Sequence, residues 1–378
     1  MLKDLPRIPE DPITRSRYRG CLLGGAVGDA LGAPVEFMSG DEIHRTFGDG
    51  GIRDYAPAFG KTSAITDDTQ MTLFTAEGLL RAFVRGRMKG ITTLPGVTAH
   101  AYLRWLRTQG REAHLDVEVG MDGWLITHRE LFDTRAPGNT CLSALESMKS
   151  FGSRATNDSK GCGGVMRVAP AGMCRATWLA DSADDNVLIE ESFALGVDLA
   201  AITHGHPTGQ LTAGFLASVI ALLLRGRPLD EAIAKSQIPL SMRPDHEETL
   251  KAVNRAQDLA DESPGSPETL TRLGEGWIAE EALAMSIYCA LSAEDFESGV
   301  VLAVNHGGDS DSTGAITGNI LGAAMGVEAI PGRWLRDLEL ADVISAVADD
   351  LAVFPDWDIG EYISSKESDF YWERYPGW

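Results

Sequence analysis

The sequence has few cysteines, few basic residues and no long uninterrupted apolar run. Five cysteines are scattered over 378 residues, and no two of them form a CxxC pair. That pattern argues against a zinc knuckle or a thioredoxin-like redox motif. The odd number and wide spacing suit reduced thiols in the cytoplasm. The five are Cys21, Cys141, Cys162, Cys174 and Cys289.

Basic residues are outnumbered by acidic ones, 33 against 55, which gives a formal net charge of -22. Such a surface disfavours binding to nucleic acid or to an anionic membrane through bulk electrostatics. The first residues, 1–6, lack the apolar run of a secretory signal. The most apolar stretch, 211–224, is too short for a membrane span and is typical of a buried helix. We therefore expect a cytoplasmic protein, and the sequence does not indicate its oligomeric state.

Strand-like alternation is scarce, whereas apolar residues recur at helical spacing in many segments. No break in composition divides the chain, so we predict a single all-α domain over 1–378. The most polar stretch, 225–275, could be an inserted helical excursion. The segments with helical spacing are 71–85, 96–106, 187–203, 210–225, 278–291 and 337–353.

Two clusters of aspartate and hydroxyl residues lie far apart in the chain, at 66–69 (TDDT) and 309–313 (DSDST), each directly before an apolar segment. Asp, Ser and Thr also cap helix N-termini, and one cluster alone would be read as a cap. A cap needs only one such residue, however, and surplus carboxylates repel one another unless they are solvated or bind a cation. Two oxygen-rich clusters therefore favour a site for a hard divalent cation.

Glycines recur at i+4 spacing in two segments, from Gly20 to Gly32 and from Gly314 to Gly326. In a helix each set forms a bare stripe along one face. Glycine costs about 1 kcal/mol relative to alanine at a helix position, so the stripes need a reason. Close approach of another backbone supplies one, and we predict that the two helices pack tightly, each being a candidate partner for the other. That packing would bring Asp29 and Glu36 near the second aspartate cluster.

Together these segments resemble the ADP-ribosylglycohydrolase family, which includes the dinitrogenase-reductase-activating glycohydrolases. The combination of GDALG, TDDT and GGDSDS, in this order, is the most specific part of the resemblance. The matching motifs are GCLLGGAVGDALGAPVEF at 20–37, TDDTQMTLFTAEGLL at 66–80, RAPGNTCLSAL at 135–145, SKGCGGVMRVAPAG at 159–172, AITHGHPTGQLTAGFLA at 201–217, LGEGWIAEEALAMSIYCAL at 273–291 and AVNHGGDSDSTGAITGNILGAAMG at 303–326.

The resemblance implies an orthogonal all-α fold around a central cleft that holds two Mg²⁺ or Mn²⁺ ions. Serine at 312 stands where the family often has threonine, and it keeps the hydroxyl. Glu36 matches a family glutamate near the metals, and Glu36, Asp68 and Asp311 would form the catalytic set. Asp29 would lie behind the ligands, or would simply bond to neighbouring backbone. The implied metal ligands are Thr66, Asp67, Asp68, Asp309, Asp311 and Ser312.

Neutral glycine-rich turns are the expected binding site for the substrate's pyrophosphate, because their N–H groups form anion-binding concavities. Lys160 could add to them. Cys162 stands where the family often has asparagine, and we expect a small buried residue beside a ligand rather than a reactive thiol. His206 and His306 are read as helix-start or substrate contacts rather than metal ligands. The expected substrate-binding residues are Asn139, Thr140, Ser159, Gly161, Cys162, Gly163, Gly164, His204 and Gly308.

The family resemblance implies metal-dependent cleavage of an α-N- or α-O-glycosidic bond between ADP-ribose and an acceptor, either a protein side chain or a small molecule. Trp277, Tyr371 and Trp372 are candidates for stacking on adenine, but each is typical of a core anchor. Two alternatives remain open: a non-catalytic binding or structural member of the same fold, and a two-metal hydrolase acting on phosphoesters.

Overall fold

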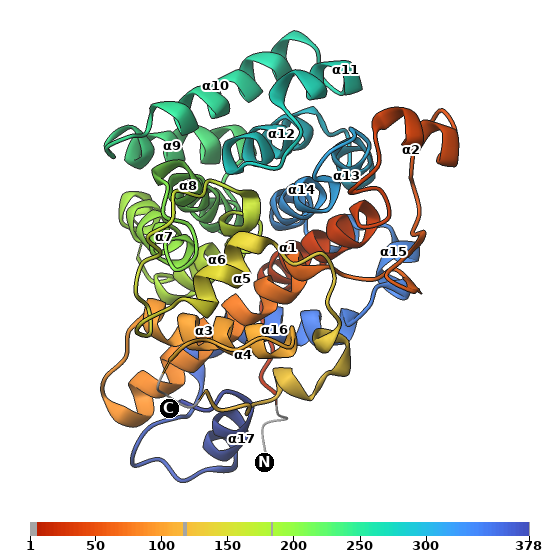
Figure 1. The fold of residues 1–378 in the computed structure, drawn as a ribbon. Helices are drawn as coiled ribbons and strands as arrows, with labels where there is room; N and C mark the ends of the chain where they lie inside the picture. Colours follow the sequence, from red (N-terminus) through yellow and green to blue (C-terminus); the bar gives the residue numbers. More distant parts are fainter. Residues whose placement is uncertain (1–5, 116–118, 183, 378) are drawn as a thin grey trace.

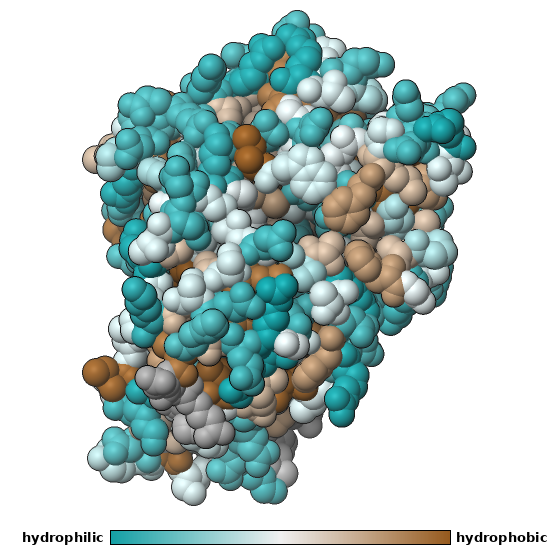
Figure 2. Space-filling view, viewed as in Figure 1, coloured by the Kyte–Doolittle hydropathy of each residue, from teal (hydrophilic) through white to brown (hydrophobic). Residues whose placement is uncertain are grey.

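The computed structural model describes residues 6–115, 119–182 and 184–377. Within these ranges the chain forms seventeen α-helices, and its strands are confined to one short hairpin of β1 (Pro57–Ala58) and β2 (Lys61–Thr62) (Figure 1). The predicted all-α fold is confirmed. The face drawn in Figure 2 is largely hydrophilic, with hydrophobic surface in small separate patches, as the charge of the chain leads one to expect.

Two helices form the centre of the protein, α1 (Pro12–Gly32) and α14 (Ser310–Met325) (Figure 1). Both are buried along most of their length. Around them lie the longer helices α3 (Asp67–Lys89), α4 (Leu94–Thr108), α6 (Ala169–Trp178), α7 (Asp185–Ala200), α8 (Pro207–Leu224), α12 (Ala279–Ser292), α13 (Phe296–Val304) and α16 (Ala341–Val353). Shorter or peripheral helices are α2 (Gly40–Phe47), α5 (Asn139–Glu146), α9 (Leu229–Ser241), α10 (Glu247–Glu262), α11 (Pro267–Leu270), α15 (Gly332–Asp337) and α17 (Lys366–Arg374).

Five of the six segments with helical spacing lie almost wholly in one helix each, namely α3, α4, α7, α8 and α12. The prediction for 337–353 was wrong at its start. Helix α16 begins only at Ala341, because Leu340 has the left-handed backbone conformation, with φ of 56°, that cannot continue a helix. The residues just before it form a loop that brings Glu339 into the interior.

Helix α8 is the one described helix with the length and apolar composition of a membrane span, but 89% of that stretch is buried inside the protein. It packs against α6, α7 and α9. The prediction of a buried helix at 211–224 is therefore confirmed.

The polar stretch 225–275 forms the helical hairpin of α9 and α10, followed by the short α11 (Figure 1). Helix α10 packs along α12 and also touches α8 and α9. The excursion is thus helical and rests on the rest of the protein, while the division of the chain into domains stays a prediction.

The two glycine stripes face each other, as predicted. A Cβ atom added to Gly24 would overlap the carbonyl oxygen of Gly318, and one added to Gly318 would overlap the carbonyl oxygen of Gly24. The same reciprocal contact joins Gly28 with Gly314, and the partners run in opposite order along the two helices. Helices α1 and α14 therefore pack antiparallel and backbone to backbone. The end of α1 meets the start of α14, where the second aspartate cluster lies.

We expect Gly24→Ala and Gly318→Ala each to lower the free energy of unfolding by about 1–3 kcal/mol, because the methyl group overpacks a contact between two backbones. Gly332→Ala is the matched control, since a Cβ atom there meets no atom within 4 Å. In the first turn of α15 that change should be neutral or stabilising by about 0.4–1 kcal/mol. Chemical denaturation of the three variants checks the prediction, and stabilisation by alanine at 24 or 318 would contradict the packing.

Candidate active site

The first aspartate cluster caps α3. Thr66 is the N-cap residue, and its hydroxyl accepts a hydrogen bond from the backbone N–H of Asp68 at 3.3 Å. Asp29, in the last turn of α1, accepts from the N–H groups of Thr66 and Thr69 at 3.0 and 3.1 Å, and also from the Thr69 hydroxyl. Asp29 thus fixes the start of α3, because it bonds to backbone N–H groups there and not to the backbone of its own helix, α1. This placement fits the prediction that it lies behind the ligands.

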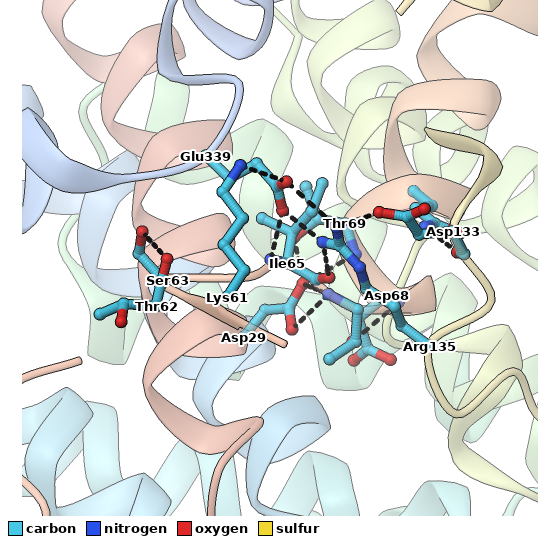
Figure 3. Close-up of polar contacts among 12 residues, drawn as sticks. Asp29, Lys61, Thr62, Ser63, Ile65, Asp68, Thr69, Asp133, Arg135 and Glu339 are labelled. Atoms are coloured by element: carbon cyan, nitrogen blue, oxygen red, sulfur yellow. Dashed lines mark hydrogen bonds and ion pairs between the residues drawn. The ribbon is translucent and has the colours of Figure 1, made fainter. Parts of the chain in front are cut away.

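A buried ion pair holds the segment that leads into the cluster (Figure 3). The guanidinium of Arg135 donates to both carboxylate oxygens of Glu339 and, at 2.8 Å, to the carbonyl of Ile65. Glu339 also accepts from the N–H of Ile65 at 3.1 Å, and its other carboxylate oxygen accepts from the ammonium group of Lys61 at 2.7 Å. The backbone carbonyl of Arg135 accepts from the N–H of Asp67 at 3.3 Å.

Sequence reasoning missed this support. Arg135 is the first residue of the motif at 135–145, but nothing in that motif indicates a buried ion pair. Glu339 lies in a loop between two helices, and no spacing or motif marks it as a partner for a residue more than 200 positions away.

Glu36 and the carboxylates of the second cluster meet in one place, and Asp67 and Asp68 of the first cluster line the same cavity. Oxygen atoms of Glu36, Asp309 and Asp311 all lie within 4.8 Å of one another. Glu36 follows α1 in a tight turn, and Asp309 and Asp311 begin α14. The inferred proximity of Glu36 to the second cluster is thereby confirmed.

Burial raises the pKa of every carboxyl group in this cluster, and the neighbouring carboxylates add to the shift. The pKa of Glu36 rises to about 11, mainly through burial and then through the charges of Asp311 and Asp309. The pKa of Asp29 rises to about 7 for the same reasons. Burial also raises the pKa of Asp67, Asp68, Asp309 and Asp311. Such a group cannot be fully ionised unless positive charge compensates it.

No lysine or arginine lines the cavity within the described part of the chain, and His204, which does line it, is neutral because burial lowers its pKa to about 3. One carboxylate oxygen of Glu36 and one of Asp68 are buried without a hydrogen-bond partner among the described residues. Unpaired buried carboxylate oxygens in a set of aspartates, a glutamate and hydroxyls fit a hard divalent cation, which prefers oxygen ligands. The residues present therefore fit the expected metal ions.

The cavity has a volume of about 470 Å³, and the acidic cluster forms one part of its wall. Another part comes from the start of α5 and from the turn at Cys162–Gly164, which adjoin the cluster through the contacts of Gly138 with Asp67 and of Cys162 with Ser312. That turn is held by the segment just before α12, because the N–H of Cys162 donates to the carbonyl of Trp277 at 3.2 Å. The lining residues are Glu36, Phe37, Asp67, Asp68, Ala136, Pro137, Gly138, Asn139, Thr140, Cys141, Gly161, Cys162, Gly163, Met166, His204, Trp277, Asp309, Asp311 and Ser312.

Four predicted site residues lie outside this lining set. Thr66 is fully buried beneath Asp68, and Gly164 packs against the carbonyl of Gly209. The Ser159 hydroxyl bonds to the Thr140 hydroxyl at 2.9 Å, so Ser159 supports a lining residue without lining the cavity itself. Gly308 lies against the backbone of Glu275, where a Cβ atom would not fit. Its position is one of close packing between two loops.

Lys160 does not face the cavity as a free cation. Its ammonium group bonds to Glu248 of α10 at 2.6 Å and to Glu280 of α12. Glu248 also accepts from the Thr208 hydroxyl at 2.5 Å. Lys160 therefore anchors the glycine turn to the helices behind it, and the pyrophosphate would have to be bound by backbone N–H groups.

The three histidines of the motifs have separate positions. His204 is buried behind the glycine turn, and burial together with the charge of Arg167 lowers its pKa to about 3, so that it is neutral. His206 is the N-cap of α8 and accepts from the N–H of Thr208 at 3.1 Å, which confirms its helix-start role. His306 bonds to the Thr313 hydroxyl at 2.8 Å.

One of the three candidate aromatic residues lies at the cavity. Trp277 is 39% exposed and stacks on the exposed ring of Phe37, with centroids 6.0 Å apart and planes inclined by 18°. Tyr371 is instead buried against Trp357, as a core anchor should be. Trp372 packs at the edge of the core beneath Lys89.

Comparison with known proteins identifies the class to which this fold and site belong. Residues 10–358 match the family described as ADP-ribosylglycohydrolase. The chain is 27% identical to the ADP-ribosylarginine hydrolase Tri1 of Serratia proteamaculans, over 91% of this chain and 81% of that protein. It is 28% identical to the ADP-ribosyl-[dinitrogen reductase] glycohydrolase of Rhodospirillum rubrum, over 87% and 92%.

Among solved structures, one titled "ADP-ribosylglycohydrolase-related protein complex" superimposes with a TM-score of 0.60 at 27% identity, covering 90% of this chain and 98% of that one. The chain therefore belongs to the ADP-ribosylglycohydrolase family and is a glycohydrolase. The family resemblance stated from the motifs is confirmed over nearly the whole chain.

Asp311→Asn should stabilise the protein in the presence of a chelator, because it removes one of several repelling buried charges while keeping the shape of the side chain. The gain should be present at neutral pH, where the native carboxyl of Asp311 would otherwise hold its charge in a buried site. The pKa of Asp311 is raised in the folded protein, so the native carboxyl binds a proton more readily than the unfolded one. The gain should therefore vanish below about pH 4, where both states are protonated.

Thermal unfolding of the wild type and of Asp311→Asn in EDTA, at neutral pH and below about pH 4, measures this effect. Asp258→Asn, at an exposed position of α10, is the control and should change nothing. Destabilisation by Asp311→Asn under chelation would mean that the cluster is not electrostatically strained.

Proposed function

We propose that the protein is a divalent-metal-dependent ADP-ribosyl hydrolase, which cleaves the α-glycosidic bond between ADP-ribose and an acceptor side chain or small molecule. The observation that carries the proposal is the division of one cavity into two parts. One part is a set of buried carboxylates with no basic side chain in the lining, and the other is a neutral turn of glycines beside a helix start. The first suits cations and ribose hydroxyls, and the second suits a pyrophosphate.

The proposed metal ligands are Thr66, Asp67, Asp68, Asp309, Asp311 and Ser312. Two Mg²⁺ or Mn²⁺ ions bound there would compensate the acidic charge, orient the ribose hydroxyls and activate a water molecule. The ligands start two helices that are held by Asp29 and by the packing of α1 on α14, so their positions are set before substrate binds.

Glu36 is the residue best placed to move a proton. One of its carboxylate oxygens has no partner among the described residues, it lines the cavity, and its pKa is raised to about 11. A bound cation would lower that pKa toward the range in which a carboxyl group acts as acid and base near neutral pH. Glu36 would then protonate the leaving group or take a proton from water, as cleavage through an oxocarbenium-like state requires.

The pyrophosphate would lie against the N–H groups of Gly163 and Gly164 and of Asn139 and Thr140 at the start of α5, since those of Gly161 and Cys162 already donate to Ser159 and Trp277. The α5 helix dipole favours negative charge there. Since the chain is strongly acidic, this neutral surface is the part of the cavity wall that repels the phosphates least.

The acceptor is proposed to be an ADP-ribosylated protein or a small molecule, and the names of the relatives suggest arginine-linked substrates as the first to test. The two rival functions differ in their products. A phosphoesterase would release phosphate or cut the pyrophosphate, and a non-catalytic relative would bind ADP-ribose without turnover.

The test is a panel of arginine-linked and serine-linked ADP-ribosyl substrates, assayed with and without EDTA. We expect free ADP-ribose to be released, activity to disappear on chelation, and Mg²⁺ or Mn²⁺ to restore it. Asp67→Asn and Asp311→Asn should each lose at least about 100-fold in kcat, because each removes a charged ligand from the site. Hydrolysis that survives rigorous chelation would contradict the metal-dependent reaction.

The stacked rings of Phe37 and Trp277 give a second test, since they form a flat surface at the cavity for the adenine base. Base stacking on an aromatic side chain contributes about 1–3 kcal/mol. Trp277→Ala should therefore raise KM about tenfold or more with a smaller change in kcat, and Trp277→Phe should restore most of the loss. Steady-state kinetics of both variants provide the measurement, and an unchanged KM would place the adenine elsewhere.

A further inference from the structure

Arg167 is a buried cation with no carboxylate partner among the described residues. It is 1% exposed and lies between the glycine turn at Cys162–Gly164 and α6. An uncompensated buried charge destabilises a protein, so this guanidinium needs a reason other than stability. The other fully buried arginines each pair with a glutamate, namely Arg81, Arg104 and Arg135.

Both ends of the Arg167 guanidinium contact the support of the cavity wall. One terminal nitrogen lies 3.2 Å from Sγ of Cys141, which lines the cavity. The other donates at 2.7 Å to the hydroxyl of Thr203, and that hydroxyl lies 2.8 Å from Nδ1 of His204, a second lining residue. A Cβ atom added to Gly163 would lie 2.8 Å from the Cys141 sulfur and 3.2 Å from the His204 ring. Arg167 is therefore one side chain removed from the glycine turn.

The direction of the hydrogen bonds is fixed at the buried end of this chain of contacts. A guanidinium nitrogen only donates, so the Thr203 oxygen accepts from Arg167 and has its own proton left to donate. Nδ1 of His204 is the nearest acceptor, because the carbonyl of Ala200 is 3.5 Å away and the sulfur of Cys141 accepts weakly. A neutral histidine whose Nδ1 accepts carries its single ring proton on Nε2.

The Nε2 atom of His204 lies against the glycine turn. Cβ atoms added to Gly161 and Gly163 would lie 3.6 and 3.5 Å from it. Nε2 has no hydrogen-bond partner among the described residues, whereas Nδ1 has the Thr203 hydroxyl. Cys162, which was expected to be buried, is partly exposed at the same turn. The ring thus directs Nε2 toward the part of the wall where the pyrophosphate is proposed to lie.

We propose that Arg167 is a positioning residue, which acts through Thr203 to hold His204 in the Nε2–H tautomer and so supplies a neutral hydrogen-bond donor for the pyrophosphate. The opposite tautomer would turn a lone pair toward the phosphate oxygens and repel them. No proton is transferred and no bond is broken. The identity of the anion rests on the proposed function, whereas the tautomer is a property of the protein without ligand.

The first experiment is imidazole ¹⁵N NMR of the full chain labelled at histidine, with the signals of His204 assigned by their loss in His204→Gln. We expect a protonated Nε2 and an unprotonated Nδ1 in the wild type. His206 is the internal reference, because its Nδ1 accepts from a backbone N–H. The wild-type spectrum needs no variant, and a proton on Nδ1 of His204 overturns the proposal by itself.

The variants test the role of Arg167 and Thr203. Thr203→Val and Arg167→Met should each give a mixture of the two His204 tautomers, and Thr203→Ser and Arg167→Lys should keep the Nε2–H form, since each retains a donor. Cys141→Ser is the matched control, because it alters only the other contact of Arg167, and it should change nothing. A pure Nε2–H signal in folded Thr203→Val or Arg167→Met, or a mixture in Cys141→Ser, overturns the proposal.

The second experiment is calorimetry with ADP-ribose and with adenosine, which carries no phosphate. Thr203→Val should bind ADP-ribose at least about tenfold more weakly, because a hydrogen bond to a charged group is lost, and Thr203→Ser should recover most of that affinity. Adenosine should bind equally to the wild type and to both variants. An equal loss for the two ligands would make Thr203 merely structural and overturn the proposal.

The two experiments separate this inference from the proposed function. A wild type that does not bind ADP-ribose contradicts the proposed function, whatever the tautomer of His204. A wild type that binds and hydrolyses its substrate while His204 carries its proton on Nδ1 contradicts this inference alone.

Discussion

The contact between the backbones of α1 and α14 is the constraint on which the rest of the structure depends. Side chains normally keep helices apart, and here glycines remove them from both surfaces. Because the two helices run antiparallel, the last turn of one meets the first turn of the other. That meeting places Asp29 and Glu36 beside Asp309 and Asp311.

The buried carboxylates of the cavity lack the cationic partners that other buried carboxylates in the described part of the protein have. Glu77 is paired with Arg104 at 2.7 Å, and Glu339 is paired with Arg135, so each of these buried carboxylates has its cation in the chain. Among the described residues, no lysine or arginine is recorded as a partner of the cavity carboxylates, which bond instead to backbone N–H groups and lie close to one another. A fold that holds these charges together without a basic side chain requires protons or metal ions to balance them. This imbalance is the strongest physical reason to propose a metal centre.

The positions of the proposed metal ligands depend on residues that do not line the cavity. Asp29 binds the N–H groups that begin α3, and the Arg135–Glu339 pair holds the chain just before them. Elsewhere in the cavity wall, Lys160 ties the glycine turn to α10 and α12 through Glu248 and Glu280. The helical hairpin of the 225–275 stretch thus contributes Glu248 to the support of the cavity, although its sequence gives no sign of a functional role.

The sequence by itself determined the helices, the two oxygen-rich clusters and the tight packing of the glycine stripes, because periodicity, charge repulsion and the absence of a Cβ are local properties of the chain. Motif order also determined the family. The start of α16 was misjudged, since a single left-handed residue, Leu340, interrupts an otherwise helical pattern. Only the tertiary structure decided that Glu339 pairs with Arg135 and that the ammonium group of Lys160 is bonded to Glu248. The tertiary structure also decided that Trp277 is exposed at the cavity, and that the sulfur atoms of Cys162 and Met166 both lie near the Ser312 hydroxyl. These are contacts between residues distant in sequence, and no local pattern of the chain records which side chains will meet when separate helices pack.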